Sequence, residues 1–211
     1  MSQGHFSKEE IFIVDDDAAV RDSLSMVFSL QGYDVVGLSD GASLLSAARQ
    51  RTPACIILDV HMPGRSGLDI LKELNADAYG APILIISGQG DIAMAVDAIK
   101  NGALDFIEKP FDGQGVLRRV REAIDAWRRR QESTGSSSVR AARFPGRDLL
   151  TQREIDVLDQ IASGASSKEA GRQLGISFRT VEVHRARIME KLGAKNAVDL
   201  ARIVFREGRG A

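Results

Sequence analysis

The chain has 211 residues and a formal net charge of −1, with 44% hydrophobic and 27% charged residues, which is ordinary for a globular protein. No apolar run approaches the about 20 residues that a membrane helix needs, so a membrane-spanning protein is excluded and no membrane partner is expected. The polar start, residues 1–10, lacks the apolar centre of a signal peptide, and the single cysteine, Cys55, cannot form an internal disulfide. We therefore expect a cytoplasmic protein of one large or two small domains.

The charges are unevenly distributed along the chain. Residues 1–112 carry 8 Lys and Arg against 17 Asp and Glu, a net charge of −9. Residues 113–146 carry 8 against 3, a net of +5, and residues 147–211 carry 12 against 9, a net of +3. This asymmetry indicates an acidic module that is joined to a module able to approach polyanions.

Short apolar runs alternate with helical patterns over the first 127 residues. The runs are typical of buried parallel strands and occupy residues 11–14, 35–36, 55–59, 82–87 and 104–107. Apolar residues at helical spacing follow each run, within residues 20–30, 44–48, 68–74, 92–99 and 116–127. Five strands that alternate with five helices predict an α/β fold with a doubly wound parallel sheet. For such a sheet we take the flavodoxin-like order 2-1-3-4-5.

Polar residues stand where these strands end. Asp15 and Asp16 follow the first strand, Asp59 ends the third, Ser87 ends the fourth and Lys109 follows the fifth. The predicted order makes the first and third strands neighbours, so three carboxylates would crowd one site. A divalent cation with oxygen ligands, such as Mg²⁺, would relieve their repulsion and share a phosphate group. The lysine and the serine would supply an ammonium and a hydroxyl for that phosphate.

Two other chemistries fit parts of this pattern. The sequence from Gly88 to Ala93 matches the dinucleotide-binding pattern G-x-G-x-x-A, and Glu108 stands twenty positions after its first glycine. That motif follows the fourth strand and leaves the Asp cluster unexplained. A Mg²⁺-dependent phosphatase of the haloacid dehalogenase type would also use an Asp nucleophile, but it needs a second acid two residues later, where His61 stands. Both alternatives stay open at this point.

A change in composition separates a second domain from the first. Residues 132–146 are rich in Ser, Gly and Arg, which is typical of a flexible linker between domains at 8–131 and 147–211. The second domain shows four short helical patterns. Thr151 and Glu154 form a capping-box signature, and Ser177 caps a longer helix that ends before Gly193. A small all-α domain with a helix–Gly turn–helix pair is therefore predicted.

The longer helix, residues 177–192, has two different faces. Val181, Ile188 and Leu192 are spaced to point toward a core. The opposite face is expected to be exposed and carries Arg179, Glu182, Val183, Ala186, Arg187 and Glu190. A DNA major groove admits such a helix, although the charges alone favour a solvated surface.

The first domain resembles a known family. Asp15-Asp16, Asp59, Met62-Pro63-Gly64, Ser87-Gly88 and Lys109-Pro110, at their strand ends, are similar to the receiver domain of two-component response regulators over about residues 8 to 127. The resemblance implies that a sensor histidine kinase phosphorylates Asp59. It also implies that Asp16, Asp59 and the backbone carbonyl of His61 bind Mg²⁺, with Asp15 acting mainly through water.

The same resemblance assigns the remaining receiver residues. Ser87 and Lys109 would hold the phosphoryl oxygens, and the Lys109-Pro110 bond is expected to be cis. Phe106 stands at the position of a rotating aromatic switch, which together with Ser87 would respond to the phosphoryl group. The protein would catalyse only its own phosphorylation and slow dephosphorylation, and would not be an enzyme in the usual sense.

The second domain resembles the LuxR-type helix-turn-helix, and the whole chain resembles the FixJ subgroup. The matching segments are Thr151-x-Arg153-Glu154, Ser167-Lys168-Glu169, Leu174-Gly175-Ile176-Ser177, Thr180-Val181-Glu182-Val183-His184 and Lys191-Leu192-Gly193. The resemblance implies a transcription regulator that binds double-stranded DNA at two half-sites as a homodimer formed on phosphorylation, with RNA polymerase as a candidate partner.

The resemblance also implies the DNA contacts. Glu182, Val183 and Ala186 would face bases, whereas phosphate contacts fall to Lys168, Thr180, Arg187 and Lys191, and Ser177 and Arg179 complete the DNA-binding set. Ala170-Gly171 departs from the family's usual Ile-Ala and is expected to soften the short helix before the turn.

Overall fold

The computed structural model describes residues 9–76, 78–88, 92–132 and 144–205. The chain divides into two compact units, Met1–Ile124 and Asp125–Ala211, each of which is described by itself. The dinucleotide-like motif includes residues 89–91, and the expected linker includes residues 133–143, so parts of both lie outside the described residues. The domain limits expected from composition therefore stay predictions.

The first unit is built on a five-stranded parallel sheet. Its strands are β1 (Glu10–Val14), β2 (Asp34–Leu38), β3 (Cys55–Asp59), β4 (Ile83–Ser87) and β5 (Asp105–Glu108). They lie in the order β2-β1-β3-β4-β5, which confirms the predicted fold. Strand β2 is longer than its two-residue apolar core suggested, because all five of its residues pair in register with β1.

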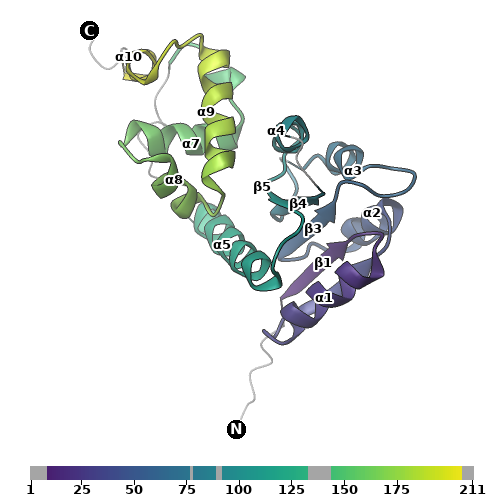
Figure 1. The fold of residues 1–211 in the computed structure, drawn as a ribbon. Coiled ribbons are helices and arrows are strands. Elements are labelled where there is room, and N and C mark those ends of the chain that lie inside the picture. The colour runs from purple at the N-terminus through teal and green to yellow at the C-terminus, as the bar shows by residue number, and fades with distance from the viewer. Residues whose placement is uncertain (1–8, 77, 89–91, 133–143, 206–211) are drawn as a thin grey trace. The chain divides into compact units, whose positions relative to one another are not determined.

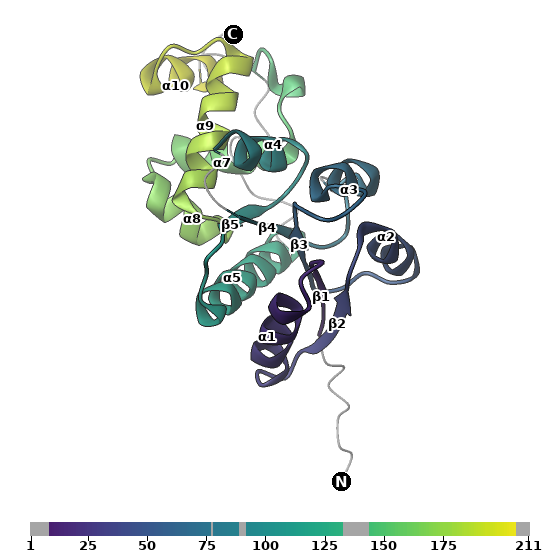
Figure 2. The same cartoon turned by 45° about the vertical axis from the view of Figure 1, so that its right-hand side comes forward.

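Helices cover both faces of this sheet, as Figures 1 and 2 show from two directions. Helices α1 (Ala18–Ser29) and α5 (Gly113–Glu132) lie on one face, and α2 (Gly41–Gln50), α3 (Gly67–Leu74) and α4 (Ile92–Lys100) lie on the other. Every residue of β3 and β4 is buried as a result. This is why these strands read as continuous apolar runs, and why Cys55 is fully buried.

The second unit consists of short helices. A 3-10 turn, η1 (Arg147–Leu149), precedes α7 (Gln152–Ala162), α8 (Ser167–Leu174), α9 (Phe178–Leu192) and α10 (Ala197–Phe205). The predicted capping box is present, with Thr151 and Glu154 each accepting the other's backbone N–H. Gly175 ends α8 in the left-handed region at φ 66°, and Ser177 caps α9.

Gly171 holds α8 close to the turn that leads into α9. A Cβ atom at this position would lie 2.7 Å from the backbone oxygen of Ile176, whose N–H donates to the carbonyl of Gly171 at 2.9 Å. The missing side chain lets two backbone segments pack together, and the expectation that Ala170-Gly171 softens the helix stays a prediction. In the described part of the chain, no helix is both long and apolar enough to cross a membrane.

Candidate metal centre and nucleic-acid interface

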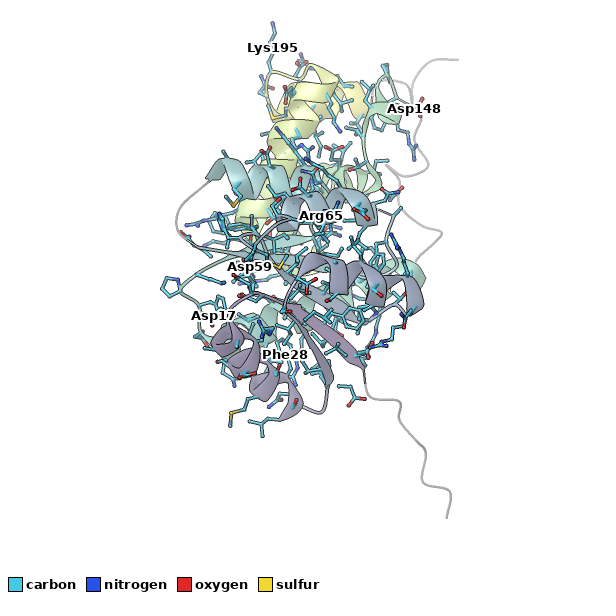
Figure 3. The ribbon with its side chains drawn as sticks, turned by 90° about the vertical axis from the view of Figure 1, so that its right-hand side faces the viewer. Asp17, Phe28, Asp59, Arg65, Asp148 and Lys195 are labelled. Atoms are coloured by element: carbon cyan, nitrogen blue, oxygen red, sulfur yellow. The ribbon has the colours of Figure 1, made fainter. Side chains whose placement is uncertain are left out.

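The predicted acidic site forms at the carboxyl end of the sheet. Asp15 follows β1 and Asp59 ends β3, and the two residues are only 2% and 3% exposed. Lys109, which follows β5, donates from Nζ to Asp15 Oδ2 and to Asp59 Oδ1, at 2.8 Å in both cases. Figure 3 labels Asp59, at the end of β3, and Asp17, the N-cap residue of α1. Lys109 is 94 positions from Asp15 and 50 positions from Asp59 in the sequence, and the three side chains meet in one site.

Burial and charge act against each other in this site. Burial raises the pKa of Asp59, the charge of Asp15 raises it further, and the hydrogen bond and charge of Lys109 lower it only partly. For Lys109, burial is the largest single influence and lowers the pKa. The two carboxylates together outweigh burial, so the pKa of Lys109 is raised and the ammonium is retained.

The donor set suits a hard divalent cation. Asp15, Asp16 and Asp59 each offer a carboxylate oxygen, and these atoms lie within 4.8 Å of one another. Three carboxylates and one ammonium leave an excess of negative charge, and oxygen-only ligands are those that Mg²⁺ takes in proteins. Asp16 is exposed, which gives an ion a path from solvent. The predicted role of the His61 carbonyl as a further ligand stays a prediction.

Two residues that the sequence analysis missed fix the backbone of the acidic site. A Cβ at Gly67 would lie 2.3 Å from the carbonyl oxygen of Asp59, so only glycine lets the start of α3 approach the end of β3. Arg21 of α1 donates from Nη1 to the carbonyl of Asp15 at 2.6 Å. Gly67 stands directly before the helical pattern predicted at 68–74, which was a usable signal, whereas nothing in the spacing of Arg21 indicated its contact.

The helix pair α8–α9 forms the second candidate site. On α9, Arg179, Glu182, Ala186 and Glu190 are exposed as predicted, whereas Val183 is half-buried. Val181 and Ile188 are fully buried, as predicted for the core face, and Leu192 is half-buried. Lys168 of α8 is exposed, and Ser177 at the N-cap of α9 is half-buried. An exposed polar face therefore begins at the N-terminus of α9, as a helix that enters a DNA groove requires.

Comparisons with known proteins match both parts of the chain. Residues 11–121 match the response regulator receiver domain, and residues 148–204 match the luxR family of bacterial regulatory proteins. The chain is 37% identical, over 96% of its length and 97% of the other, to the transcriptional regulatory protein FixJ of Bradyrhizobium diazoefficiens. It is 38% identical to the regulatory protein TdiR of Thauera aromatica, over 93% and 85% of the two chains.

A crystal structure of full-length FixJ from B. japonicum matches 97% of this chain and 99% of its own, with a TM-score of 0.55 and 34% identity. The chain belongs to the two-component response regulators. Within them it joins a receiver domain to a LuxR-type DNA-binding domain, as the resemblance to the FixJ subgroup predicted. Neither alternative, the dinucleotide-binding protein or the phosphatase, is supported by these matches.

The two residues that are predicted to act as a switch, Ser87 and Phe106, both lie among the described residues. Ser87 is 1% exposed, and its Oγ donates to Met94 Sδ of α4 at 3.3 Å and lies 3.4 Å from His61 Nδ1. Phe106 is half-buried in β5, and its backbone carbonyl accepts a hydrogen bond from Arg119 of α5 at 3.0 Å. The Lys109-Pro110 bond is cis, as predicted. Neither Met94 nor Arg119 was singled out from the sequence.

A buried carboxylate links α7 to α9 in the DNA-binding domain. Glu154 is fully buried, and its Oε2 accepts from Lys191 Nζ at 2.7 Å, while Oε1 lies 4.0 Å from Arg187 Nε. The prediction that Arg187 lies on the exposed face is wrong, because only 18% of its side chain is exposed. The predicted phosphate contact of Thr180 does not fit either, since Thr180 is 3% exposed and its hydroxyl lies 2.9 Å from that of Ser177.

His184 is a buried residue that the sequence analysis left without a role. It is 3% exposed, and neither ring nitrogen has a hydrogen-bond partner within the described ranges. Burial lowers its pKa to about 3, and the charges of Arg153, Arg187 and Lys191 act in the same direction. Its spacing from Val181 and Ile188, three and four residues, was a signal that it faces the core.

Proposed function

We propose that a sensor histidine kinase phosphorylates this protein on Asp59 and that the modification controls how α9 binds DNA. The observation that carries the proposal is the bridge from Lys109 Nζ to Asp15 and Asp59, which places one ammonium beside a buried carboxylate at the end of β3. The Asp59 carboxylate is thus held close to the Lys109 ammonium, which can also bind the oxygens of an incoming phosphoryl group.

The proposed reaction transfers one phosphoryl group in each step. A carboxylate oxygen of Asp59 attacks the phosphorus of a phosphohistidine, the P–N bond breaks, and the leaving imidazole takes up a proton. Hydrolysis later returns Asp59 as a carboxylate and releases inorganic phosphate. Lys109 balances the added negative charge. The Ser87 hydroxyl donates to a phosphoryl oxygen after its hydrogen bond to Met94 has broken. The chain acts on no other substrate, so this is self-catalysis rather than an enzyme activity.

Asp15, Asp16 and Asp59 would hold the Mg²⁺, with the carbonyl of His61 as a further ligand. When bound, the ion would neutralise charge on the phosphoryl oxygens. The protein's own contribution is to hold the three carboxylates together at the sheet edge, with Asp16 toward solvent.

The proposed output is DNA binding as a dimer in the cytoplasm. Movement of Ser87 toward the phosphoryl group and of Phe106 into the core would change the surface of α4, β5 and α5, where we place the contact between two receivers. Two DNA-binding domains would then occupy two half-sites, with Glu182, Val183 and Ala186 toward bases and Lys168, Ser177, Arg179 and Lys191 toward the backbone. RNA polymerase is the candidate downstream partner.

Labelling with acetyl phosphate tests the phosphoacceptor directly. The protein should gain one phosphoryl group by intact mass in the presence of Mg²⁺ or Mn²⁺, and Asp59→Asn should gain none, because an amide is not a nucleophile for this transfer. Asp22→Asn, which changes an exposed acid on α1, is the matched control and should label normally. Stable labelling of Asp59→Asn, or full labelling in excess chelator, would contradict the proposal.

A further inference from the structure

A small polar network joins the first residue of α8 to α9. Ser167 Oγ donates to Glu182 Oε1, and Arg185 Nη1 donates to Ser167 Oγ at 3.0 Å. The same Nη1 lies 3.4 Å from Glu182 Oε1. The serine hydroxyl therefore accepts from the arginine and donates to the glutamate, so that each member of the network holds the next.

The network occupies one oxygen of Glu182 and leaves the other available. Oε2 has no hydrogen-bond partner among the residues that the structure describes, and the side chain is 54% exposed. A glutamate side chain has three rotatable bonds and loses considerable freedom when one conformation is selected. Fixing Oε1 in advance therefore gives Oε2 a defined direction before any ligand arrives.

Helix stability does not account for the Ser167 hydroxyl. The N-cap of α8 is Ser166, whose hydroxyl and backbone N–H form a capping box with Glu169. An exposed Arg–Glu pair three residues apart on one helix contributes little to folding. The network is thus better explained by what it does to the direction of the Glu182 carboxylate.

We propose that Ser167 and Arg185 are positioning residues that hold Glu182 so that its second oxygen accepts a hydrogen bond from a base edge. The proposal rests on the proposed DNA binding through α9. Phosphates repel a carboxylate, so Glu182 can only gain affinity from a donor in the groove. The amino group of cytosine is the donor that glutamate accepts from in the major groove. Ser167 and Arg185 would in this way determine specificity without touching a base.

The test compares base preferences of full-length variants. The acetyl phosphate-treated chain is used to select sequences from random double-stranded DNA, in parallel with Ser167→Ala, Arg185→Ala, Glu182→Ala and the double variant Ser167→Ala/Glu182→Ala. Ser167→Ala should lower the preference for the selected base by about 3- to 10-fold at the same DNA position that Glu182→Ala affects. This loss is a part of the discrimination of about 5- to 150-fold that a good side-chain–base pair provides. Arg185→Ala should relax the same position.

Three readouts separate positioning from general damage. The double variant should show the same loss at that position as Glu182→Ala alone, because the serine acts only through the glutamate. Ser167→Thr keeps the hydroxyl and should restore the preference. Ser163→Ala, which changes the exposed C-cap serine of α7 whose hydroxyl donates to the carbonyl of Gln160, is the matched control and should leave all positions unchanged.

Failure of this inference is distinguishable from failure of the proposed function. A wild-type base preference in Ser167→Ala, together with relaxation in Glu182→Ala, overturns the positioning role and leaves DNA reading by α9 intact. Additive losses in the double variant, or equal weakening at every position, also overturn it. A wild-type chain that selects no sequence at all would overturn the proposed function and this inference with it.

Discussion

At the scale of single residues, Lys109 controls the charge balance of the acidic site. Its ammonium contacts both buried carboxylates, so its positive charge also weakens the binding of a metal cation to them. We expect Lys109→Met to lower the free energy of unfolding in chelator by about 1–3 kcal/mol, because two buried acids lose their partner. The same variant should bind Mg²⁺ more tightly than wild type.

Thermal unfolding at increasing Mg²⁺ concentration measures both effects of Lys109→Met, since a ligand that binds the folded state raises the midpoint. Lys100→Met is the control, because Lys100 is exposed and its ammonium lies 3.8 Å from Asp97 on the surface of α4. An unchanged midpoint in chelator and an unchanged Mg²⁺ response would show that the ammonium does not balance these carboxylates.

His184 should make the DNA-binding domain sensitive to acid. Its pKa is about 3 in the folded state against an ordinary value of 6.5, so the unfolded chain binds the extra proton between these pH values. Stability is therefore fully present above pH 6.5 and falls as the pH decreases toward 3, by about 1.4 kcal/mol per pH unit. Denaturant unfolding of the full chain across this range, compared with His184→Leu, isolates the contribution. Parallel pH curves for the two proteins would contradict it.

At the scale of elements, Glu154 joins the start of α7 to the second half of α9. Glu154→Gln would leave Lys191 and Arg187 without their anionic partner, and we expect a loss of about 2–4 kcal/mol in the free energy of unfolding. Glu190→Gln, an exposed change on α9, should cost little. Denaturant unfolding compares the two variants. Equal stability of Glu154→Gln and wild type would mean that the two helices are held together by apolar packing alone.

Local patterns predicted the elements well, because their causes are local. The capping box at Thr151 and the capped start of α9 at Ser177 depend on neighbours within four residues. The order of the strands is not local, and it was predicted by taking the flavodoxin-like order for a sheet whose strands alternate with helices. Arg187 was misjudged because spacing along one helix does not show what lies opposite it. A long side chain can cover its own charge by reaching a buried carboxylate on another helix, and only the packed structure reveals that partner.

At the scale of the whole molecule, the proposed switch requires that a change at Asp59 alters assembly. Charge alone is screened within about 10 Å in solution, so coupling needs an element with two arrangements that the phosphoryl group biases. Ser87, bonded to Met94 in α4, and Phe106, attached through its carbonyl to Arg119 in α5, connect the site to two helices. This arrangement is consistent with a surface that changes on phosphorylation.

We therefore expect a mainly monomeric protein without phosphoryl donor and a dimer with it. DNA affinity for a two-half-site operator should rise at least about 10-fold on phosphorylation, because pairing raises the effective concentration of the second DNA-binding domain. Light scattering measures the oligomeric state and DNA titration measures the affinity, each with and without acetyl phosphate. Acetyl phosphate should change neither property of Asp59→Asn. A constitutive dimer with unchanged DNA affinity would contradict the switch.

The position of Cys55 gives the receiver domain a built-in chemical reporter. It is the only cysteine of the chain, it is fully buried in β3 four residues before Asp59, and burial raises the pKa of its thiol. A folded receiver therefore shields this thiol from alkylating reagents, whereas strand separation exposes it. The rate of alkylation at one atom thus follows the opening of the sheet without any engineered label. Unfolding confined to the DNA-binding domain leaves that rate unchanged.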